Sequence, residues 1–145
     1  PSADHPPIAV DPSRALTILV IEDNDDAREM LHAWLRDLGH RVQTASDGFE
    51  GLDAARAIAP DVVLIDIGLP GLDGYQVAEN LRASSNGHHP LLIAVTGYGR
   101  PEDSARAREA GFDAHLVKPV EPEQLARLIH AQAGPGDQRL TYGSP

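Results

Sequence analysis

The sequence predicts a doubly wound α/β domain, in which helices cover both faces of a five-stranded parallel sheet. Strands buried on both faces read as runs rich in Val, Ile and Leu, and strict alternation of strands with helices is typical of a parallel sheet. Each strand-like run in this chain is followed by a helical pattern. The runs are Leu16–Ile21, Val62–Ile65 and Leu91–Val95, with weaker ones at Arg41–Ala45 and Ala114–Val117.

The helices are predicted from apolar residues spaced three and four apart and from the residues at helix ends. Between Ala27 and Leu38 the apolar residues follow this spacing, and Gly39 stands where a C-terminal cap belongs. Met30 and Trp34 in this segment are predicted to be core residues. Prolines at the first turn and a glycine as a stop support the later helices. These are expected at Phe49–Ile58, Tyr75–Ala83, Pro101–Ala110 and Pro122–Ala133, with Gly111 as the stop.

The two ends of the chain differ in composition from the middle. Residues 1–14 contain four prolines among small and polar residues, and residues 134–145 are rich in glycine and proline. Such segments are poor material for a core. We therefore expect one domain at residues 15–133, a flexible arm or linker at 1–14 and a flexible tail at 134–145. The arm, and a first residue that is proline, favour a piece of a longer protein.

The composition argues against several classes of function. Twelve basic and 22 acidic side chains give the 145-residue chain a formal net charge of -10, which disfavours a nucleic acid partner. The chain has no cysteine, in agreement with a reducing cytoplasm. No apolar run approaches the length of a membrane span, so we expect a cytoplasmic segment without membrane contact. The basic residues are eleven arginines and one lysine, Lys118.

Polar residues follow four of the predicted strands at the point where each strand ends. Because the carboxyl ends of parallel strands meet at one edge of a sheet, and ligands bind there, we expect these residues to form one site. Glu22 and Asp23 follow the first strand, Asp66 the third, Thr96 the fourth and Lys118 the fifth.

The types of these residues indicate phosphoryl transfer. Three carboxylates at one edge would repel each other unless a cation lay among them. Hard oxygen ligands suit Mg²⁺, which commonly takes a substrate phosphate as a further ligand. Lys118 would add a positive charge and Thr96 a hydroxyl donor. A carboxylate nucleophile, a divalent ion and an ammonium group together form a phosphoryl-transfer site.

Four segments closely resemble the receiver domains of two-component response regulators. They are Ile18–Asn24, Val63–Gly74, Ala94–Gly97 and Val117–Pro119, and they occur in the order and spacing of that family. The likeness spans about residues 15–133. It implies a flavodoxin-like sheet with strand order 2-1-3-4-5 and a signalling domain rather than an enzyme, one that assists its own phosphorylation and dephosphorylation.

The resemblance also implies a partner and a metal site. Asp66 matches the aspartate that accepts a phosphoryl group from the phosphohistidine of a histidine kinase or a histidine phosphotransfer domain. Glu22, Asp23, Asp66 and the backbone carbonyl of Gly68 match the ligands of Mg²⁺ or Mn²⁺.

The remaining family positions concern switching. Thr96 matches the hydroxyl that moves toward the phosphoryl group, and Lys118 matches the lysine that pairs with the phosphorylated aspartate. The bond from Lys118 to Pro119 is commonly cis in the family. The signal would reach a downstream protein through the fourth helix, fifth strand and fifth helix, with no direct contact to nucleic acid.

Three positions depart from the family pattern. His115 occupies the aromatic switch position, where the family usually has Tyr or Phe. A switching residue and a half-exposed histidine without that role both stay open. Glu22 replaces the commoner Asp but is still a hard oxygen ligand, so metal binding is expected to survive. Gly68 has no side chain to guide a hydrolytic water.

Other functions on a similar sheet match the residues less well. An aspartate-nucleophile phosphatase needs a second acid two residues after the nucleophile, where this chain has Gly68. A flavodoxin-like binding protein needs a loop of Ser, Thr and Gly after the first strand, whereas this chain has the acidic run Glu22–Asp26. A receiver that has lost phosphorylation would not be expected to keep all five site residues.

The sequences of two segments, Thr96–Gly99 and Gly111–Pro119, resemble those of receivers at the C-terminal end of hybrid sensor histidine kinases. We therefore expect this chain to be the receiver of such a kinase, in its cytoplasmic part. The alternative is a stand-alone single-domain response regulator.

Overall fold

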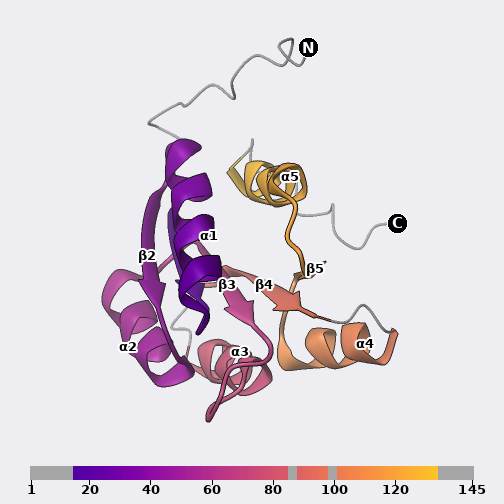
Figure 1. The fold of residues 1–145 in the computed structure, drawn as a ribbon. Coiled ribbons are helices and arrows are strands. Elements are labelled where there is room, and N and C mark those ends of the chain that lie inside the picture. Colours follow the sequence, from indigo (N-terminus) through magenta and orange to yellow (C-terminus); the bar gives the residue numbers. More distant parts are fainter. Residues whose placement is uncertain (1–14, 85–87, 98–100, 134–145) are drawn as a thin grey trace.

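A parallel sheet forms the centre of the molecule, which a computed structural model describes over residues 15–84, 88–97 and 101–133 (Figure 1). Its strands are β1 (Thr17–Ile21), β2 (Arg41–Ala45), β3 (Val62–Asp66), β4 (Leu91–Thr96) and β5 (Ala114–Val117). The order across the sheet is β2-β1-β3-β4-β5, and every neighbouring pair is parallel. The predicted doubly wound class and strand order are confirmed.

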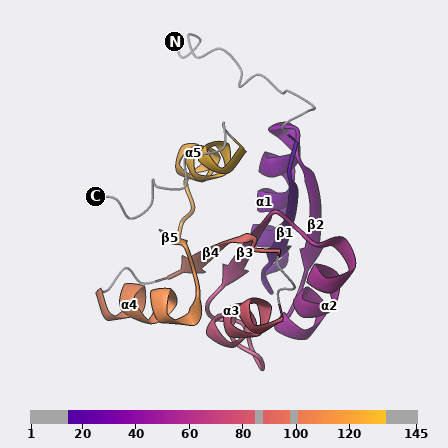
Figure 2. The ribbon, with the colours of Figure 1, turned by 180° about the vertical axis from the view of Figure 1, so that it is seen from behind.

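Helices cover both faces of this sheet. They are α1 (Asp25–Asp37), α2 (Gly48–Ile58), α3 (Gly74–Ala83), α4 (Pro101–Ala110) and α5 (Pro122–Ala133). Figures 1 and 2 show α1 and α5 on one face and α2, α3 and α4 on the other. Two apolar clusters correspond to these layers: one joins the sheet to α1 and α5, the other joins it to α2, α3 and α4. Burial of apolar surface in these two layers is the main stabilising contribution.

Three helices begin at side-chain caps that lie just beyond the carboxyl ends of strands. Asn24 accepts a hydrogen bond from the Ala27 amide at the start of α1, and Asp47 accepts one from the Glu50 amide at the start of α2. Asp73 forms a reciprocal capping box at the start of α3. These caps satisfy amides that have no partner within the helix, so they fix where each helix leaves the site edge of the sheet.

One core prediction in α1 is wrong. Met30 is 43% exposed, whereas Leu31 and Leu35 carry the buried stripe of this helix. Met30 precedes Leu31 by one residue, which on a helix turns the side chain by about 100° away from that stripe. Trp34 is half-buried and packs against the cluster shared by the sheet, α1 and α5, so its predicted place is confirmed.

Some predictions concern parts of the chain that the structure does not describe. The predicted arm at 1–14 and tail at 134–145 lie outside the described residues. Within the residues that are described, no helix combines the length and apolar character needed to cross a bilayer.

Candidate functional site

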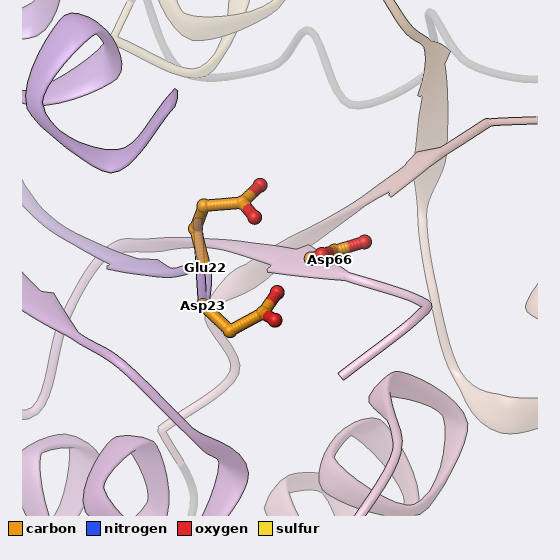
Figure 3. Close-up of side chains that lie close together, drawn as sticks. All are labelled: Glu22, Asp23 and Asp66. Atoms are coloured by element: carbon orange, nitrogen blue, oxygen red, sulfur yellow. The ribbon is translucent and has the colours of Figure 1, made fainter. Parts of the chain in front are cut away.

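The carboxylates of Glu22, Asp23 and Asp66 converge beyond the ends of β1 and β3 (Figure 3). Each offers an oxygen, and these oxygens all lie within 4.8 Å of one another. Asp66 is the last residue of β3, while Glu22 and Asp23 directly follow β1. Because β1 and β3 are neighbours in the sheet, residues far apart in sequence meet at this edge.

The Glu22 carboxylate is buried and accepts a hydrogen bond from a backbone amide. Only 2% of the residue is exposed, and the Asn24 amide donates to Oε2 at 3.1 Å. Burial raises the pKa of Glu22 above its ordinary value, and the negative charge of Asp66 adds to this effect. The Asn24 amide and the Lys118 ammonium act in the opposite direction. The protein thus keeps an acid where its charged form is costly unless a cation is near.

The Asp66 carboxylate has an amide donor and an ammonium group as partners. The Gly68 amide donates to its Oδ1 at 3.0 Å, and Lys118 Nζ lies 3.5 Å from its Oδ2. Lys118 Nζ also lies 3.6 Å from Glu22 Oε1, so one ammonium faces two of the three acids. Lys118 directly follows β5, and its peptide bond to Pro119 is cis, as in the family pattern. The predicted grouping of the acids with the lysine is therefore present in the fold.

The donor set fits a magnesium ion. Three carboxylate oxygens close together are hard ligands, and Mg²⁺ keeps several coordination positions for waters and phosphate oxygens when the protein supplies few. Two of the three acids are buried and the third, Asp23, is exposed, so the cluster opens to solvent on one side. The Gly68 amide donates a hydrogen bond to Asp66. The role of the Gly68 carbonyl as a metal ligand stays a prediction.

Thr96 and His115 lie on the α4 side of this edge. Thr96 ends β4, is 8% exposed, and accepts a hydrogen bond from the Lys118 amide through its carbonyl at 2.8 Å. Both residues line a cavity of about 10 Å³, together with Tyr75, which is room for about one water. His115 is exposed, with Nε2 3.4 Å from Ser104 Oγ on α4. The switching roles of both residues stay predictions.

Two residues near the acids were not predicted from the sequence. Asn24 caps α1 and also donates its amide to Glu22. Arg28 donates from Nη1 to the Glu22 carbonyl oxygen at 2.9 Å, and its side chain is only 19% exposed. The available signal was an arginine one turn into a helix that directly follows an acidic run. An arginine at such a position in a helix is usually a solvated surface charge, so the sequence pattern did not predict its contact with the Glu22 carbonyl.

Comparison with known proteins agrees with this geometry. The chain matches the family model of the response regulator receiver domain over residues 18–130. Among solved structures, a receiver domain of a sensor histidine kinase from Pseudomonas aeruginosa, with a magnesium ion coordinated in its active-site cleft, superposes with a TM-score of 0.76. The sequences are 33% identical, and the match covers 83% of this chain and 99% of the other.

Relatives of two kinds share the domain. Protein PilH of Pseudomonas aeruginosa is 35% identical over 114 residues, which cover 79% of this chain and 94% of PilH. The sensor histidine kinase GacS of Pseudomonas protegens is 30% identical over 120 residues, which cover 81% of this chain but 13% of GacS. The family match contains every residue of the site, from Glu22 to Lys118, and on this basis the chain belongs to the response regulator receiver domain family of two-component signalling.

Proposed function

We propose that Asp66 accepts a phosphoryl group from the phosphohistidine of a histidine kinase or a histidine phosphotransfer domain. The observation that carries this proposal is the position of Asp66, whose Oδ2 faces Lys118 at 3.5 Å while its carboxylate lies in the acidic cluster. A carboxylate oxygen of Asp66 forms a bond to phosphorus as the phosphorus–nitrogen bond breaks. The electron pair of the broken bond stays on the imidazole nitrogen.

The surrounding residues lower the cost of this step. Glu22 and Asp23 would hold Mg²⁺ together with Asp66 and the Gly68 carbonyl, and the ion would neutralise phosphoryl oxygens. Lys118 places a compact ammonium beside the accepting oxygen, where it can pair with a phosphoryl oxygen once the group is transferred.

The phosphorylated state would be transmitted through α4, β5 and α5. The Thr96 hydroxyl would turn toward the new phosphoryl oxygens, and the surface above it would change with that movement. The modest anchoring of α4 supports this part of the proposal. Among the described side chains of α4, the buried ones are those of Ala107 and Ala110, so a shift of α4 would sacrifice little apolar burial.

We further propose that the chain is the receiver of a hybrid sensor histidine kinase. The matches to GacS and to a kinase receiver support this context. The 94% coverage of PilH supports the alternative, a stand-alone regulator that signals by docking. A histidine kinase core encoded in the same reading frame as this domain would establish the hybrid kinase. A reading frame that encodes this domain alone would establish the stand-alone regulator.

Phosphoryl acceptance is tested with a small acyl phosphate and Mg²⁺. Intact mass should increase by one phosphoryl group in the wild type and not in Asp66→Asn, because the amide oxygen is a far weaker nucleophile than a carboxylate. Asp37→Asn at the end of α1 is the matched control and should be labelled normally. Equal labelling of Asp66→Asn and the wild type would exclude Asp66 as the acceptor.

A further inference from the structure

Asp23 differs from the other two acids in how it is held. Glu22 and Asp66 each accept a hydrogen bond from a backbone amide, whereas no described residue bonds to the Asp23 carboxylate. Asp23 is also exposed. Its oxygen nevertheless lies within the 4.8 Å cluster. The direction of this side chain therefore depends on the backbone on either side of it.

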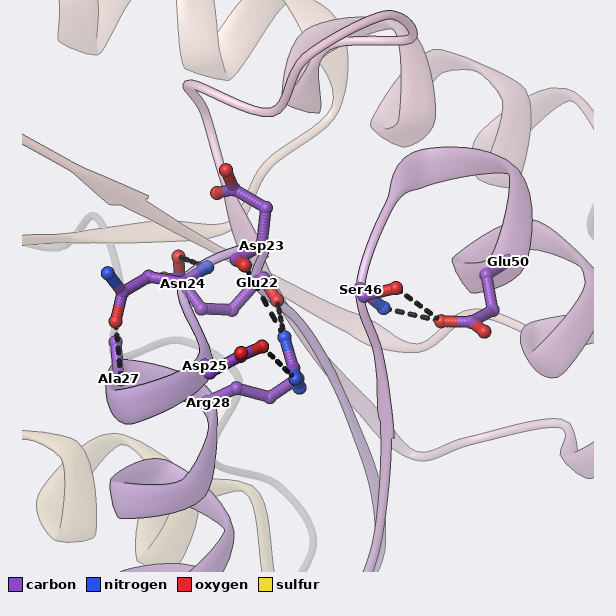
Figure 4. A network of polar contacts seen from close by, with 8 residues as sticks. All are labelled: Glu22, Asp23, Asn24, Asp25, Ala27, Arg28, Ser46 and Glu50. Carbon is purple, nitrogen blue, oxygen red and sulfur yellow. Dashed lines mark hydrogen bonds and ion pairs between the residues drawn. The ribbon is translucent and has the colours of Figure 1, made fainter.

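Arg28 holds that backbone (Figure 4). Its Nη1 donates to the Glu22 carbonyl oxygen at 2.9 Å and lies 3.5 Å from the carbonyl oxygen of Asp23. Its Nη2 pairs with Asp25 Oδ1 at 2.5 Å. The guanidinium thus lies between the first turn of α1 and the peptide that joins Glu22 to Asp23.

The helix provides a firm base for this contact. Leu31 and Leu35 fix α1 in the apolar cluster on its face of the sheet, and Asn24 caps its first turn. A guanidinium has a planar fork that binds two acceptors at once with little loss of freedom. Arg28 uses this fork to tie the strand end back to the helix that follows it.

We propose that Arg28 is a positioning residue for the metal site, which orients Asp23 by holding the Glu22–Asp23 peptide. The inference rests on the proposed metal site. Fixing the Glu22 carbonyl restricts rotation of that peptide, and this rotation sets the direction in which the Asp23 side chain leaves the chain. Because the charge of Arg28 is paired with Asp25, its effect on the ion is mainly orientation rather than repulsion.

The test removes the contact without changing net charge. The double variant Arg28→Ala with Asp25→Asn loses one charge of each sign. We expect its Mg²⁺ dissociation constant, measured by calorimetry, to rise about tenfold, the lower range for loss of a group that orients a metal ligand. Labelling of Asp66 by an acyl phosphate should be slow at limiting Mg²⁺ and return to the wild-type rate at saturating Mg²⁺.

A matched control is present on α2. Arg56 and Asp53 form an ion pair with the same spacing in sequence, at 2.9 Å, with both side chains exposed. Arg56→Ala with Asp53→Asn removes the same two charges away from the acidic cluster. Its Mg²⁺ dissociation constant should equal that of the wild type within experimental error.

The outcomes separate this inference from the proposed function. If the Arg28 double variant binds Mg²⁺ as tightly as the wild type, the inference is wrong, even if its stability in EDTA is lower. Should that variant fail to fold, Arg28→Lys decides, because lysine keeps the charge but lacks the planar fork that joins the Glu22 carbonyl to Asp25, and an unchanged affinity overturns the inference. A wild type that binds no Mg²⁺ overturns it together with the metal site. Normal Mg²⁺ binding without any labelling of Asp66 overturns the proposed function alone.

Discussion

His40 lies between the start of the sheet and the end of α5, and its imidazole acts as a hydrogen-bond acceptor. The Leu16 amide donates to its Nδ1 at 3.0 Å, which requires a ring without a proton on that nitrogen. Burial lowers the pKa of His40 below its ordinary value, and the positive charges of His130 and Arg41 lower it further. The folded state therefore favours the neutral ring.

This arrangement predicts a pH-dependent stability. Below the ordinary value of 6.5 the unfolded chain protonates His40 while the folded chain does not, so the free energy of unfolding should fall as the pH drops from there through the lowered folded pKa. His40→Asn keeps an acceptor near the Leu16 amide and does not titrate. Urea unfolding at several pH values should show a shallower decline for this variant, and an identical decline would exclude His40 as the cause.

The placement of the five candidate site residues could be predicted because each ends or follows an apolar strand. That position alone places Asp66, Thr96 and Lys118 at one edge of a parallel sheet. Arg28 could not be predicted in this way, since its proposed role rests on a contact with the Glu22 carbonyl oxygen, and sequence spacing does not indicate which carbonyl lies nearby. The prediction that Met30 is a core residue was wrong for a related reason, because apolar character alone does not indicate which face of α1 is buried.

At the scale of elements, α3 approaches the site more closely than any side chain would allow. A Cβ added at Gly74 would lie 2.6 Å from the Asp66 carbonyl oxygen and 2.7 Å from Ile67 Cα. Both contacts are with backbone, which cannot rotate aside. The absence of a side chain at the first residue of α3 thus sets the distance between this helix and the end of β3.

Gly74→Ala should move α3 away from β3. We expect a loss of about 1–3 kcal/mol in the free energy of unfolding, the usual range for overpacking, measured by urea titration. Gly97→Ala is the matched control, because a Cβ there meets nothing within 4 Å, and it should change stability little. Equal losses for the two variants would contradict the close approach as the cause.

The helix boundaries show which physical signals a sequence carries. Apolar spacing placed the first helix from Ala27, and the second and third from Phe49 and Tyr75, whereas the structure begins each one or two residues earlier. The early residues are fixed by caps such as Asn24 and Asp47. Capping side chains bond to backbone amides of the first turn and do not belong to the buried face. The spacing of apolar residues therefore does not predict where a capped helix begins.

Across the whole molecule, the order of the strands is what assembles the site. Periodicity predicts five strands but does not say which are neighbours, and that order followed from resemblance to a family. The observed order places β3 between β1 and β4, which brings Asp66 beside the acids that follow β1. The proposed metal site therefore forms only when β1 and β3 pair in the folded sheet, and its occupation should be linked to folding.

This linkage predicts that Mg²⁺ stabilises the folded chain. An ion that binds only the native state at a hundredfold excess over its dissociation constant adds about 2.7 kcal/mol. The thermal midpoint should therefore be several degrees higher in Mg²⁺ than in EDTA at equal ionic strength. Asp23→Asn should lose most of this increase, because a neutral amide oxygen attracts a divalent cation more weakly than a carboxylate does. An increase of the same size in Asp23→Asn, or with a monovalent salt alone, would argue against ion binding at these acids.

The place of Lys118 in the chain has a consequence for synthesis. All three acids precede it, and it enters only with the residues after β5. A nascent or truncated polypeptide that stops before β5 carries the negative charges of the site without the ammonium that offsets them. Such a fragment lacks the ammonium that faces Glu22 and Asp66 in the complete domain. If Asp66 accepts a phosphoryl group as proposed, translation would therefore have to pass β5 before a copy of this domain could hold that group beside its ammonium partner.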